Sequence, residues 1–250
     1  MGKQRRIRDL LRVRTGVVES AVVFESVPRF AVISAHNRQE MLRDTIHSIA
    51  HQCDRVIVVD NASDPPITCD RAWHKNGIVI IRDAEQPPNL SRLWNRGIEL
   101  AKSAAMHQRA TQWDVAVFGD DVIIPHDWWD RVSGHMRALG CVAGATHGIN
   151  PISEHRVLKA RSNDIYMRMP GWAWMLKGES DITLDESFRW WWGDTDLDFR
   201  CREMGGVVIA PGPIAVNREP NRWTVEKPEL TRQAGQDRMN FIRKWGDVPW

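Results

Sequence analysis

The chain has 250 residues, 34 Lys and Arg against 32 Asp and Glu, and a formal net charge of +2. This length suits one large domain or two small ones, and so small a charge argues against nucleic acid as the main partner. The sequence has no run of eighteen apolar residues and no signal-peptide core after its basic start. We therefore expect no integral membrane segment and a cytoplasmic protein.

Three local features of composition complete this picture. Basic residues dominate positions 1–14, which predicts a solvated N-terminal extension over residues 1–29. The four cysteines are widely scattered, which favours ordinary buried thiols over a zinc site or a disulfide framework. The 13 Trp residues against a single Tyr are unusual, and several lie beside charged, Gly or Pro positions.

From residue 30 onward, β-branched runs alternate with helical patterns, which is typical of β-α-β units. The predicted strands cover residues 30–34, 55–59, 78–82, 115–120, 141–146, 173–176 and 207–210. Apolar stripes at helical spacing lie between them, at Leu42, Ile46, Ile49 and Ala50 and again at Leu90, Leu93, Trp94, Ile98 and Ala101. The predicted fold class is α/β, with a mainly parallel twisted sheet and helices on both faces.

Polar residues follow each of the first four predicted strands. They are His36, Asn37 and Arg38, then Asp60, Asn61 and Ser63, then Asp83, then Asp120 and Asp121. Ligands of open α/β sheets bind outside the carboxyl ends of the strands, so these positions predict a binding site. The alternative is that strand ends are polar because loops are hydrated, but this does not account for the run of aspartates.

Asp120 and Asp121 are adjacent carboxylates at the end of a buried strand. They repel each other and need a positive counterpart, which Mg²⁺ or Mn²⁺ supplies because these ions prefer oxygen ligands and phosphates. A solvated turn is the alternative for the pair taken alone. The neighbouring strand ends favour the metal-site interpretation.

A second acidic cluster occupies residues 194–198. Asp196 and Asp198 stand four residues before Arg200 and Arg202, which predicts ion pairs on a helix whose apolar stripe is Leu197, Cys201 and Met204. Asp194 has no such partner and lies at the predicted helix start. It is either a helix N-cap or a base that is presented to a substrate hydroxyl, and one role does not exclude the other.

In their order along the chain, these segments resemble family 2 glycosyltransferases with a GT-A-type fold. The matching strings are Phe30-Ala-Val-Ile-Ser-Ala-His-Asn-Arg38, Val58-Val-Asp-Asn-Ala-Ser63, Asn95-Arg-Gly-Ile98, Phe118-Gly-Asp-Asp-Val122, Asp185-Glu-Ser-Phe188 and Gly193-Asp-Thr-Asp-Leu-Asp-Phe-Arg200. The resemblance implies a catalytic domain over residues 30–210. Within this domain, the nucleotide-sugar half would cover residues 30–121 and the acceptor half would cover residues 122–210. A C-terminal tail or flap would follow over residues 211–250.

The resemblance also implies roles for individual residues. Asp60 would contact the nucleobase, Asn37 and Arg38 would lie near the nucleotide, and Asp83 and Asn95 would complete the donor site. Asp120 and Asp121 would be a variant of the family's Asp-x-Asp motif for the ribose-diphosphate and the metal, with Asp121 as the metal ligand. Asp194 would be the general base of an inverting transfer. Two positions depart from the family: Gly193 stands where Glu is frequent, and Asn217 where a late His can complete the metal site.

The expected activity is therefore the metal-dependent transfer of a sugar from a nucleotide sugar, most simply a UDP-sugar, to an acceptor hydroxyl. The acceptor class stays open among glycans, lipid-linked sugars and proteins, with Trp172, Trp191 and Trp192 as candidate sugar-binding faces. Arg218 and Arg222 are candidates for closing over the diphosphate, although solvent exposure explains them equally well. A nucleotidyltransferase or a non-catalytic carbohydrate-binding protein are the alternative functions.

Overall fold

The structure is a computed structural model that describes residues 27–69, 73, 77–160, 167–219 and 226–246. Most of the predicted N-terminal extension, and Arg222 in the tail, therefore lie outside the described residues. Within the described part of the chain, no helix is both long and apolar enough to cross a bilayer.

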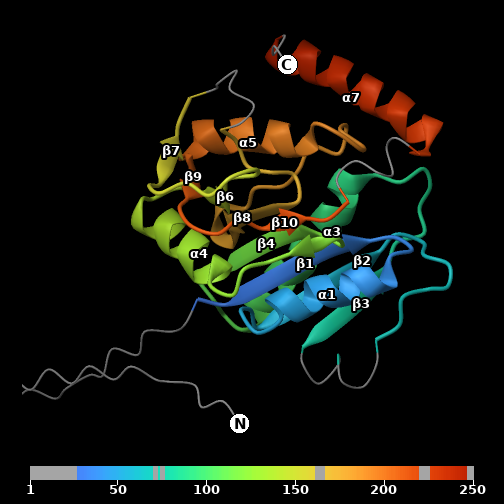
Figure 1. The fold of residues 1–250 in the computed structure, drawn as a ribbon, viewed down its shortest axis with the longest axis horizontal. Helices are drawn as coiled ribbons and strands as arrows, with labels where there is room; N and C mark the ends of the chain where they lie inside the picture. Colours follow the sequence, from blue (N-terminus) through green and yellow to red (C-terminus); the bar gives the residue numbers. More distant parts are fainter. Residues whose placement is uncertain (1–26, 70–72, 74–76, 161–166, 220–225, 247–250) are drawn as a thin grey trace, which may run out of the picture.

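The core is one eight-stranded sheet with the order β3-β2-β1-β4-β8-β6-β9-β7 (Figure 1). Its strands are β1 (Arg29–Ala35), β2 (Arg55–Asp60), β3 (Ile78–Arg82), β4 (Asp114–Gly119), β6 (Ala143–Thr146), β7 (Arg156–Leu158), β8 (Ala173–Lys177) and β9 (Val207–Ala210). The first four are mutually parallel, whereas β8 runs antiparallel to both β4 and β6. Strands β6 and β9 are again parallel, and β7 closes the edge in the antiparallel direction.

Helices cover both faces of this sheet, as predicted (Figure 1). On one face, α1 (Gln39–Ile49) and α4 (Trp128–Ala138) pack against alternate strand residues such as Ala31 and Ile33. On the other face, α3 (Leu90–His107) and α5 (Gly193–Met204) pack against Phe30 and Val32. The two-residue period of a strand sends neighbouring side chains into opposite layers, so the central strands are apolar over most of their length. The predicted α/β fold class is confirmed.

A two-stranded ribbon and a C-terminal helix complete the fold. Strand β10 (Val216–Asn217) pairs antiparallel with β5 (Val122–Ile123), which follows directly after the Asp120-Asp121 pair. Helix α7 (Pro228–Trp245) lies over the N-terminal part of α5 (Figure 1). A short 3-10 helix, η1 (Gly178–Ser180), follows β8. Strand β10 therefore brings the chain back beside the carboxyl end of β4.

Some expectations from the sequence were incomplete or wrong. Helices α4 and α7 and strand β7 were not predicted. Met204 is 57% exposed, so it does not belong to the buried stripe of α5 that holds Leu197 and Cys201. The prediction of buried thiols is correct for Cys141 and Cys201, but Cys69 is exposed and Cys53 half-buried; all four are free.

Candidate functional site

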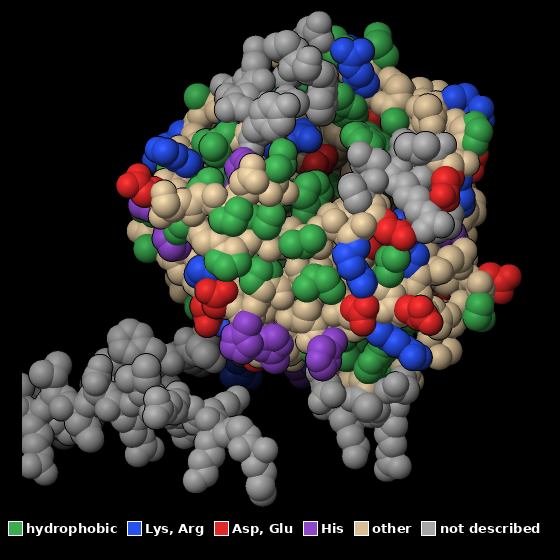
Figure 2. Space-filling view, in the orientation of Figure 1, with side chains coloured by type: hydrophobic (Ala, Val, Ile, Leu, Met, Phe, Trp, Pro, Cys, Tyr) green, Lys and Arg blue, Asp and Glu red, His purple; other side chains and the backbone are tan. Residues whose placement is uncertain are grey.

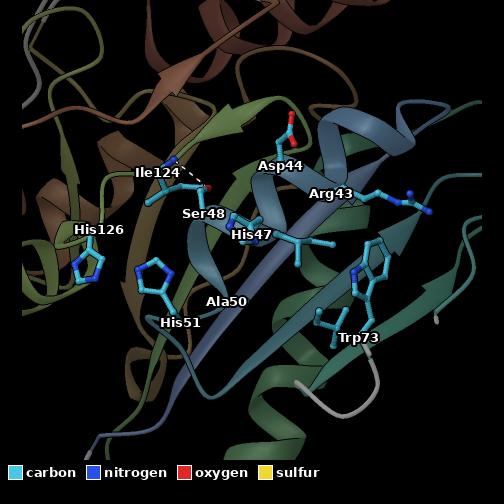
Figure 3. Close-up of a pocket in the computed structure, with 11 residues that line it drawn as sticks. Arg43, Asp44, His47, Ser48, Ala50, His51, Trp73, Ile124 and His126 are labelled. Carbon is cyan, nitrogen blue, oxygen red and sulfur yellow. Dashed lines mark hydrogen bonds between the residues drawn. The ribbon is translucent and has the colours of Figure 1, made fainter. Parts of the chain in front are cut away.

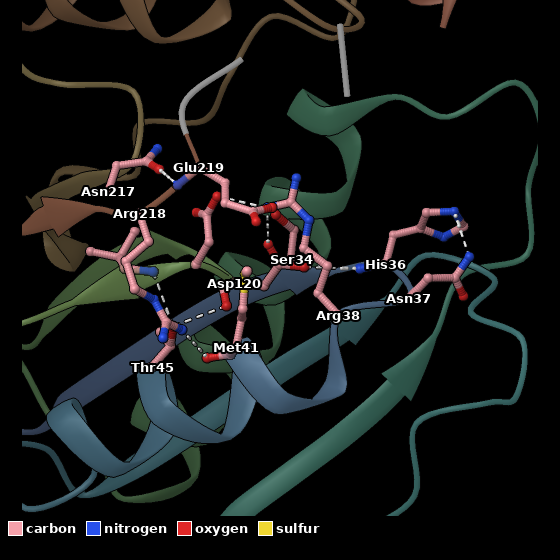
Figure 4. A network of polar contacts seen from close by, with 12 residues as sticks. Ser34, His36, Asn37, Arg38, Met41, Thr45, Asp120, Asn217, Arg218 and Glu219 are labelled. Atoms are coloured by element: carbon pink, nitrogen blue, oxygen red, sulfur yellow. Dashed lines mark hydrogen bonds and ion pairs between the residues drawn. The ribbon is translucent and has the colours of Figure 1, made fainter. Parts of the chain in front are cut away.

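The carboxyl ends of β1, β2, β3 and β4 meet at one edge of the sheet, and β10 lies beside them (Figures 1 and 4). The structure thus brings the predicted strand-end residues together. The central contact links Arg38 to the acidic pair: its Nη1 lies 2.6 Å from Asp121 Oδ2 and 3.4 Å from Asp120 Oδ1. The His36 backbone N–H also donates to Asp120 Oδ2 at 3.2 Å.

Both carboxylates of the acidic pair are largely hidden from solvent, with side chains 13% and 8% exposed. Burial raises the pKa of Asp120 to about 7. The positive charge of Arg38 lowers this pKa, whereas the negative charge of Asp121 raises it further. Burial also raises the pKa of Asp121, and the negative charge of Glu219 adds to this shift. At both carboxyls, therefore, burial outweighs the charge of Arg38 and favours the protonated form.

Thr45 on α1 braces the turn that carries the pair, a role that was not predicted. Its hydroxyl donates to the Asp120 carbonyl at 3.0 Å and accepts the Val122 backbone N–H at 3.1 Å. Thr45 is fully buried and follows Leu42 by three residues, so it lies on the apolar stripe of α1. The sequence did contain a signal for such a bond: a hydroxyl-bearing residue within an apolar helical stripe.

The loop after β1 is tied to the loop after β2. Asn37 has a left-handed backbone with φ of 57°, its Oδ1 accepts the Asp64 N–H at 2.7 Å, and its own N–H donates to Ser63 Oγ at 3.0 Å. The His36 ring lies 2.6 Å from the Asn61 carbonyl. This loop is therefore preformed, with Arg38 directed at the acidic pair (Figure 4).

Asp60 and Asp83 are almost completely buried, and each is bonded within the protein. Asp60 accepts the Ser63 N–H at 2.9 Å and pairs with Arg82 at 3.0 Å. Asp83 pairs with Arg92 at 3.1 Å and with Arg96 at 2.8 Å. Burial alone would raise the pKa of Asp83, but bonds to Arg96 and Glu85 and the charge of Arg92 lower it below its ordinary value. Both residues shape the edge at the ends of β2 and β3.

Asn95, which was predicted to complete the donor site, makes its hydrogen bonds within the protein. Its amide nitrogen donates to the Leu184 carbonyl and to Glu186 Oε1, both at 3.0 Å, and its Oδ1 accepts the Leu184 N–H at 2.8 Å. Every hydrogen-bonding group of this amide is thus used between α3 and the segment before α5. Asn95 therefore holds that segment in place.

The two residues before β8, Gly171 and Trp172, lie between Asp194 and the acidic pair. The Gly119 N–H donates to the Trp172 carbonyl at 3.0 Å, and a Cβ atom on Gly119 would lie 3.0 Å from Asp121 Oδ1. One residue earlier, a Cβ atom on Gly171 would lie only 2.6 Å from Asp194 Oδ2. Gly119, Trp172 and Gly171 therefore form a continuous backbone contact with the carboxylates of Asp121 and Asp194 at its two ends.

Asp194 is the second residue of α5, because Trp192 rather than Asp194 is the N-cap. Its carboxylate is half-buried and has no hydrogen-bond or ion-pair partner among the described residues. The other acidic residues of this helix are paired as predicted, Asp196 with Arg200 at 2.8 Å and Asp198 with Arg202 at 2.6 Å. Asp194 is thus the carboxylate of this cluster that is available to a substrate.

The three candidate tryptophans differ in their surroundings. Trp192 is 6% exposed, and its ring packs 4.6 Å from that of Phe241 in a small aromatic cluster, so the prediction of a sugar-binding face is wrong for it. Trp191 is partly buried against the same cluster. Trp172 is half-buried at the site, and its indole N–H donates to the Ala215 carbonyl at 3.1 Å.

The segment around β10 contributes to the site differently from what was expected. Arg218 does not face the acidic pair with its side chain: its guanidinium pairs with Asp44 at 2.8 Å, whereas its backbone N–H donates to the Asp121 carbonyl at 3.0 Å. Asn217 Oδ1 accepts the Glu219 N–H (Figure 4). Glu219, which was not predicted, is the residue of this segment whose charge acts on Asp121.

A separate hollow of about 830 Å³ lies beside α1 (Figure 3). Its lining includes His47, His51 and His126, which Figure 3 labels. Figure 2 shows that histidine side chains gather at the lower edge of the molecule. The rings of His51 and His126 lie 4.6 Å apart. Across the described residues, however, no group of three or more His, Cys, Asp or Glu side chains is arranged to hold a metal ion.

Comparisons with known proteins agree with this geometry. The model of the family "Glycosyl transferase family 2" matches residues 30–220. A comparison with curated proteins found no match.

Similar solved structures include *S. aureus* TarS 1–349, with a TM-score of 0.54 at 11% identity, and the same protein in complex with UDP-GlcNAc, with a TM-score of 0.58 at 10% identity. These alignments cover 86% of this chain and 66% or 67% of TarS 1–349, and 40% of the longer TarS structure. At this identity the likeness shows the fold. The family assignment rests on the family model, which matches well over half of the chain: the chain belongs to glycosyl transferase family 2.

Proposed function

We propose that this protein transfers a sugar from a UDP-sugar to an acceptor hydroxyl, with a divalent metal at Asp121 and Asp194 as the general base. One observation supports this most strongly. Asp121 and the unpartnered carboxylate of Asp194 lie at the two ends of the contact formed by Gly119, Trp172 and Gly171. The leaving diphosphate needs a metal that a carboxylate can hold, and the attacking hydroxyl needs a base on the opposite side of the anomeric carbon in the same site.

The donor side of the proposal rests on the edge formed by β1 to β4. *S. aureus* TarS 1–349, which shares this fold, has been solved with UDP-GlcNAc and with UDP. We assign the nucleoside to the side of Asp60, Asp83 and Asn37, and the diphosphate to Arg38 and Asp120. The guanidinium of Arg38 suits this role because it binds phosphate oxygens in a bidentate manner. The half of the chain up to residue 121 is thus the proposed donor half.

The residues at the acidic pair fit a divalent metal. Asp120, Asp121 and Glu219 offer hard oxygen donors, and a bound cation would offset the cost of ionising the two buried carboxyls of the pair, whose pKa values burial raises. Mg²⁺ and Mn²⁺ are commonly held by one or two carboxylates together with substrate phosphates, which agrees with the lack of a complete side-chain cage among the described residues. When bound, the ion would stabilise the charge that develops on the leaving diphosphate.

The acceptor side has Asp194 as its reactive group. As base it would take the proton from the acceptor hydroxyl while the hydroxyl oxygen bonds to the anomeric carbon and the bond to the diphosphate breaks. Attack from the face opposite the leaving group would invert the configuration. Trp172 and Trp191 remain proposed faces for an acceptor, which would be a glycan, a lipid-linked sugar or a protein. The cytoplasmic location likewise stays a prediction.

A nucleotide screen tests the proposed function. We expect UDP to raise the Tm only in the presence of Mn²⁺ or Mg²⁺, since a ligand at 100 times its Kd adds about 2.7 kcal/mol to the free energy of unfolding. UDP-sugars that bind should then be hydrolysed slowly, with release of UDP. Adenosine and guanosine diphosphates are the controls. Equal stabilisation by all three nucleotides, or none by any of them with either metal, would contradict the donor assignment.

The close approach of Gly171 to Asp194 gives a more local prediction. In Gly171→Ala, the new Cβ atom would lie 2.6 Å from Asp194 Oδ2, so the carboxylate must move. We expect kcat for UDP-sugar hydrolysis to fall at least ~10-fold, because small displacements of a catalytic group are costly, whereas UDP binding is retained.

Gly134→Ala on α4 is the matched control for Gly171→Ala. A Cβ atom there meets nothing within 4 Å, so activity should stay unchanged. The helix should gain about 0.5–1 kcal/mol of stability, as an exposed helical Gly→Ala change usually does. An unchanged kcat in Gly171→Ala would place the base elsewhere.

A further inference from the structure

Asp237 of α7 is a fully buried carboxylate that binds the backbone of the turn before α5. Its Oδ1 accepts the Arg189 N–H at 3.2 Å, and its Oδ2 accepts the N–H groups of Trp190 and Trp191 at 2.8 and 2.9 Å. The Gln233 side chain donates a fourth bond at 2.9 Å. Three consecutive backbone N–H groups thus converge on one side chain from a distant helix.

This arrangement explains how Asp237 can be buried. An isolated carboxylate in the protein interior is strongly unfavourable unless it is hydrogen-bonded or paired. Successive backbone N–H groups form a concave site for an anion, and here the anion is supplied by the protein itself. No ion pair involves Asp237 among the described residues, so its compensation comes from the turn. The turn and α7 therefore hold each other in place.

The turn leads directly into the proposed base. Trp192 adopts a left-handed backbone with φ of 70°, and its carbonyl accepts the Asp196 N–H at 2.8 Å in the first turn of α5. A non-Gly residue in this conformation is strained and persists only where the surroundings enforce it. Here Phe241 of α7, fully buried, lies under the Trp192 ring. Helix α7 thus supports the residue that precedes Gly193 and Asp194.

Helix α3 holds the same turn from its other side. The Leu90 N–H donates to the Arg189 carbonyl at 2.6 Å, and Ser91 Oγ donates to the Phe188 carbonyl at 2.6 Å. Farther along α7, Trp245 Nε1 donates to Asp196 Oδ1 at 2.8 Å. The start of α5 is therefore fixed between a helix of the donor half and a helix from the end of the chain.

We propose that Asp237 is a positioning residue for the reaction: through the turn 189–192, helix α7 sets the place of the Asp194 carboxylate. This inference rests on the proposed function, since it assumes that Asp194 is the base. Under this proposal, the tail predicted over residues 211–250 supports the acceptor side of the site. Asp237 itself contacts backbone and Gln233 rather than the reacting atoms.

The test is Asp237→Asn in the full chain, assayed with the UDP-sugar that the wild type hydrolyses in the screen above. The amide keeps the size of the carboxylate but sets an N–H₂ group against backbone N–H groups. We expect kcat to fall about 10- to 100-fold, the range for a misplaced catalytic group, with KM for the donor and UDP binding within twofold of wild type. Amide hydrogen exchange at residues 189–194 should accelerate at least ~10-fold, which reports local opening of the turn.

Two further variants keep the test decisive. Glu229→Gln removes an exposed carboxylate from the same helix and should match wild type in all readouts. Phe241→Leu keeps an apolar core but removes the ring under Trp192, so it should lower kcat and speed exchange even if Asp237→Asn folds poorly. Unchanged kcat in both Asp237→Asn and Phe241→Leu, with faster exchange, overturns the positioning role. A wild type that hydrolyses no UDP-sugar instead overturns the proposed function, independently of Asp237.

Discussion

Asp194→Asn is expected to lower kcat for UDP-sugar hydrolysis and for transfer by ~10²–10⁴-fold, the usual contribution of a general base. The amide preserves the shape of the side chain but cannot accept a proton. Because the Asp194 carboxylate has no partner among the described residues, the change breaks no bond of the fold. The Tm and the metal-dependent affinity for UDP should therefore equal those of the wild type, and kinetics together with thermal denaturation check this.

Asp196→Asn is the instructive comparison for Asp194→Asn. Asp196 lies two residues further along α5, but it is fully buried and bonded to Arg200 and Trp245. Its substitution should lower the Tm as well as the activity, because a buried ion pair loses one partner. If Asp194→Asn transfers sugar at the wild-type rate, another group is the base.

Asp121→Ala is expected to abolish the Mn²⁺-dependent stabilisation by UDP and to lower kcat/KM by ~10²-fold or more. A metal contributes several kcal/mol to the stabilisation of developing charge, and each 1.36 kcal/mol corresponds to tenfold in rate. The variant also removes the 2.6 Å contact between Asp121 and Arg38, whose guanidinium can bind phosphate oxygens. Residual, metal-independent UDP binding at low ionic strength is therefore compatible with the loss of the metal effect.

The control for Asp121→Ala is Glu99→Gln, which removes an exposed carboxylate of α3 away from the strand ends. It should keep the full response to Mn²⁺ and UDP. Titration of Mn²⁺ followed by Tm separates the two variants without any need for the acceptor. A full Mn²⁺-dependent UDP response in Asp121→Ala would remove Asp121 from the metal site.

The meeting of polar residues at the carboxyl ends of β1 to β4 could be predicted from the sequence because its determinants are local. Strands buried on both faces appear as short apolar runs, and the polar residue after each run must lie at the same edge when the strands are parallel. Arg38, Asp120 and Asp121 were found in this way. Their direct contact was not predictable, because it depends on the backbone of the loop after β1.

Other residues of the site depend on contacts between distant segments, which no local pattern reveals. Asn95 was assigned to the donor, but its amide is used by Leu184 and Glu186, some 90 residues away. Trp192 was assigned to an acceptor, but the ring of Phe241 packs against it. Phe241 belongs to a helix that was not predicted, so this contact could not be foreseen. Helix α7 itself escaped detection because Asp237 stands in its buried stripe between Leu230 and Phe241, and a charged residue interrupts the apolar period.

The pairing of β10 with β5 has a consequence for how this enzyme is made. Asn217 lies opposite Val122, so the strand that follows the acidic pair stays unpaired until the chain has been synthesised almost a hundred residues further. The strands β1 to β4 precede Asp194 and Glu219 in the chain, so a nascent chain that ends after β4 lacks both carboxylates. Under the proposed function such a chain has no base, and local detachment of this two-residue ribbon would inactivate the protein before the main sheet unfolds.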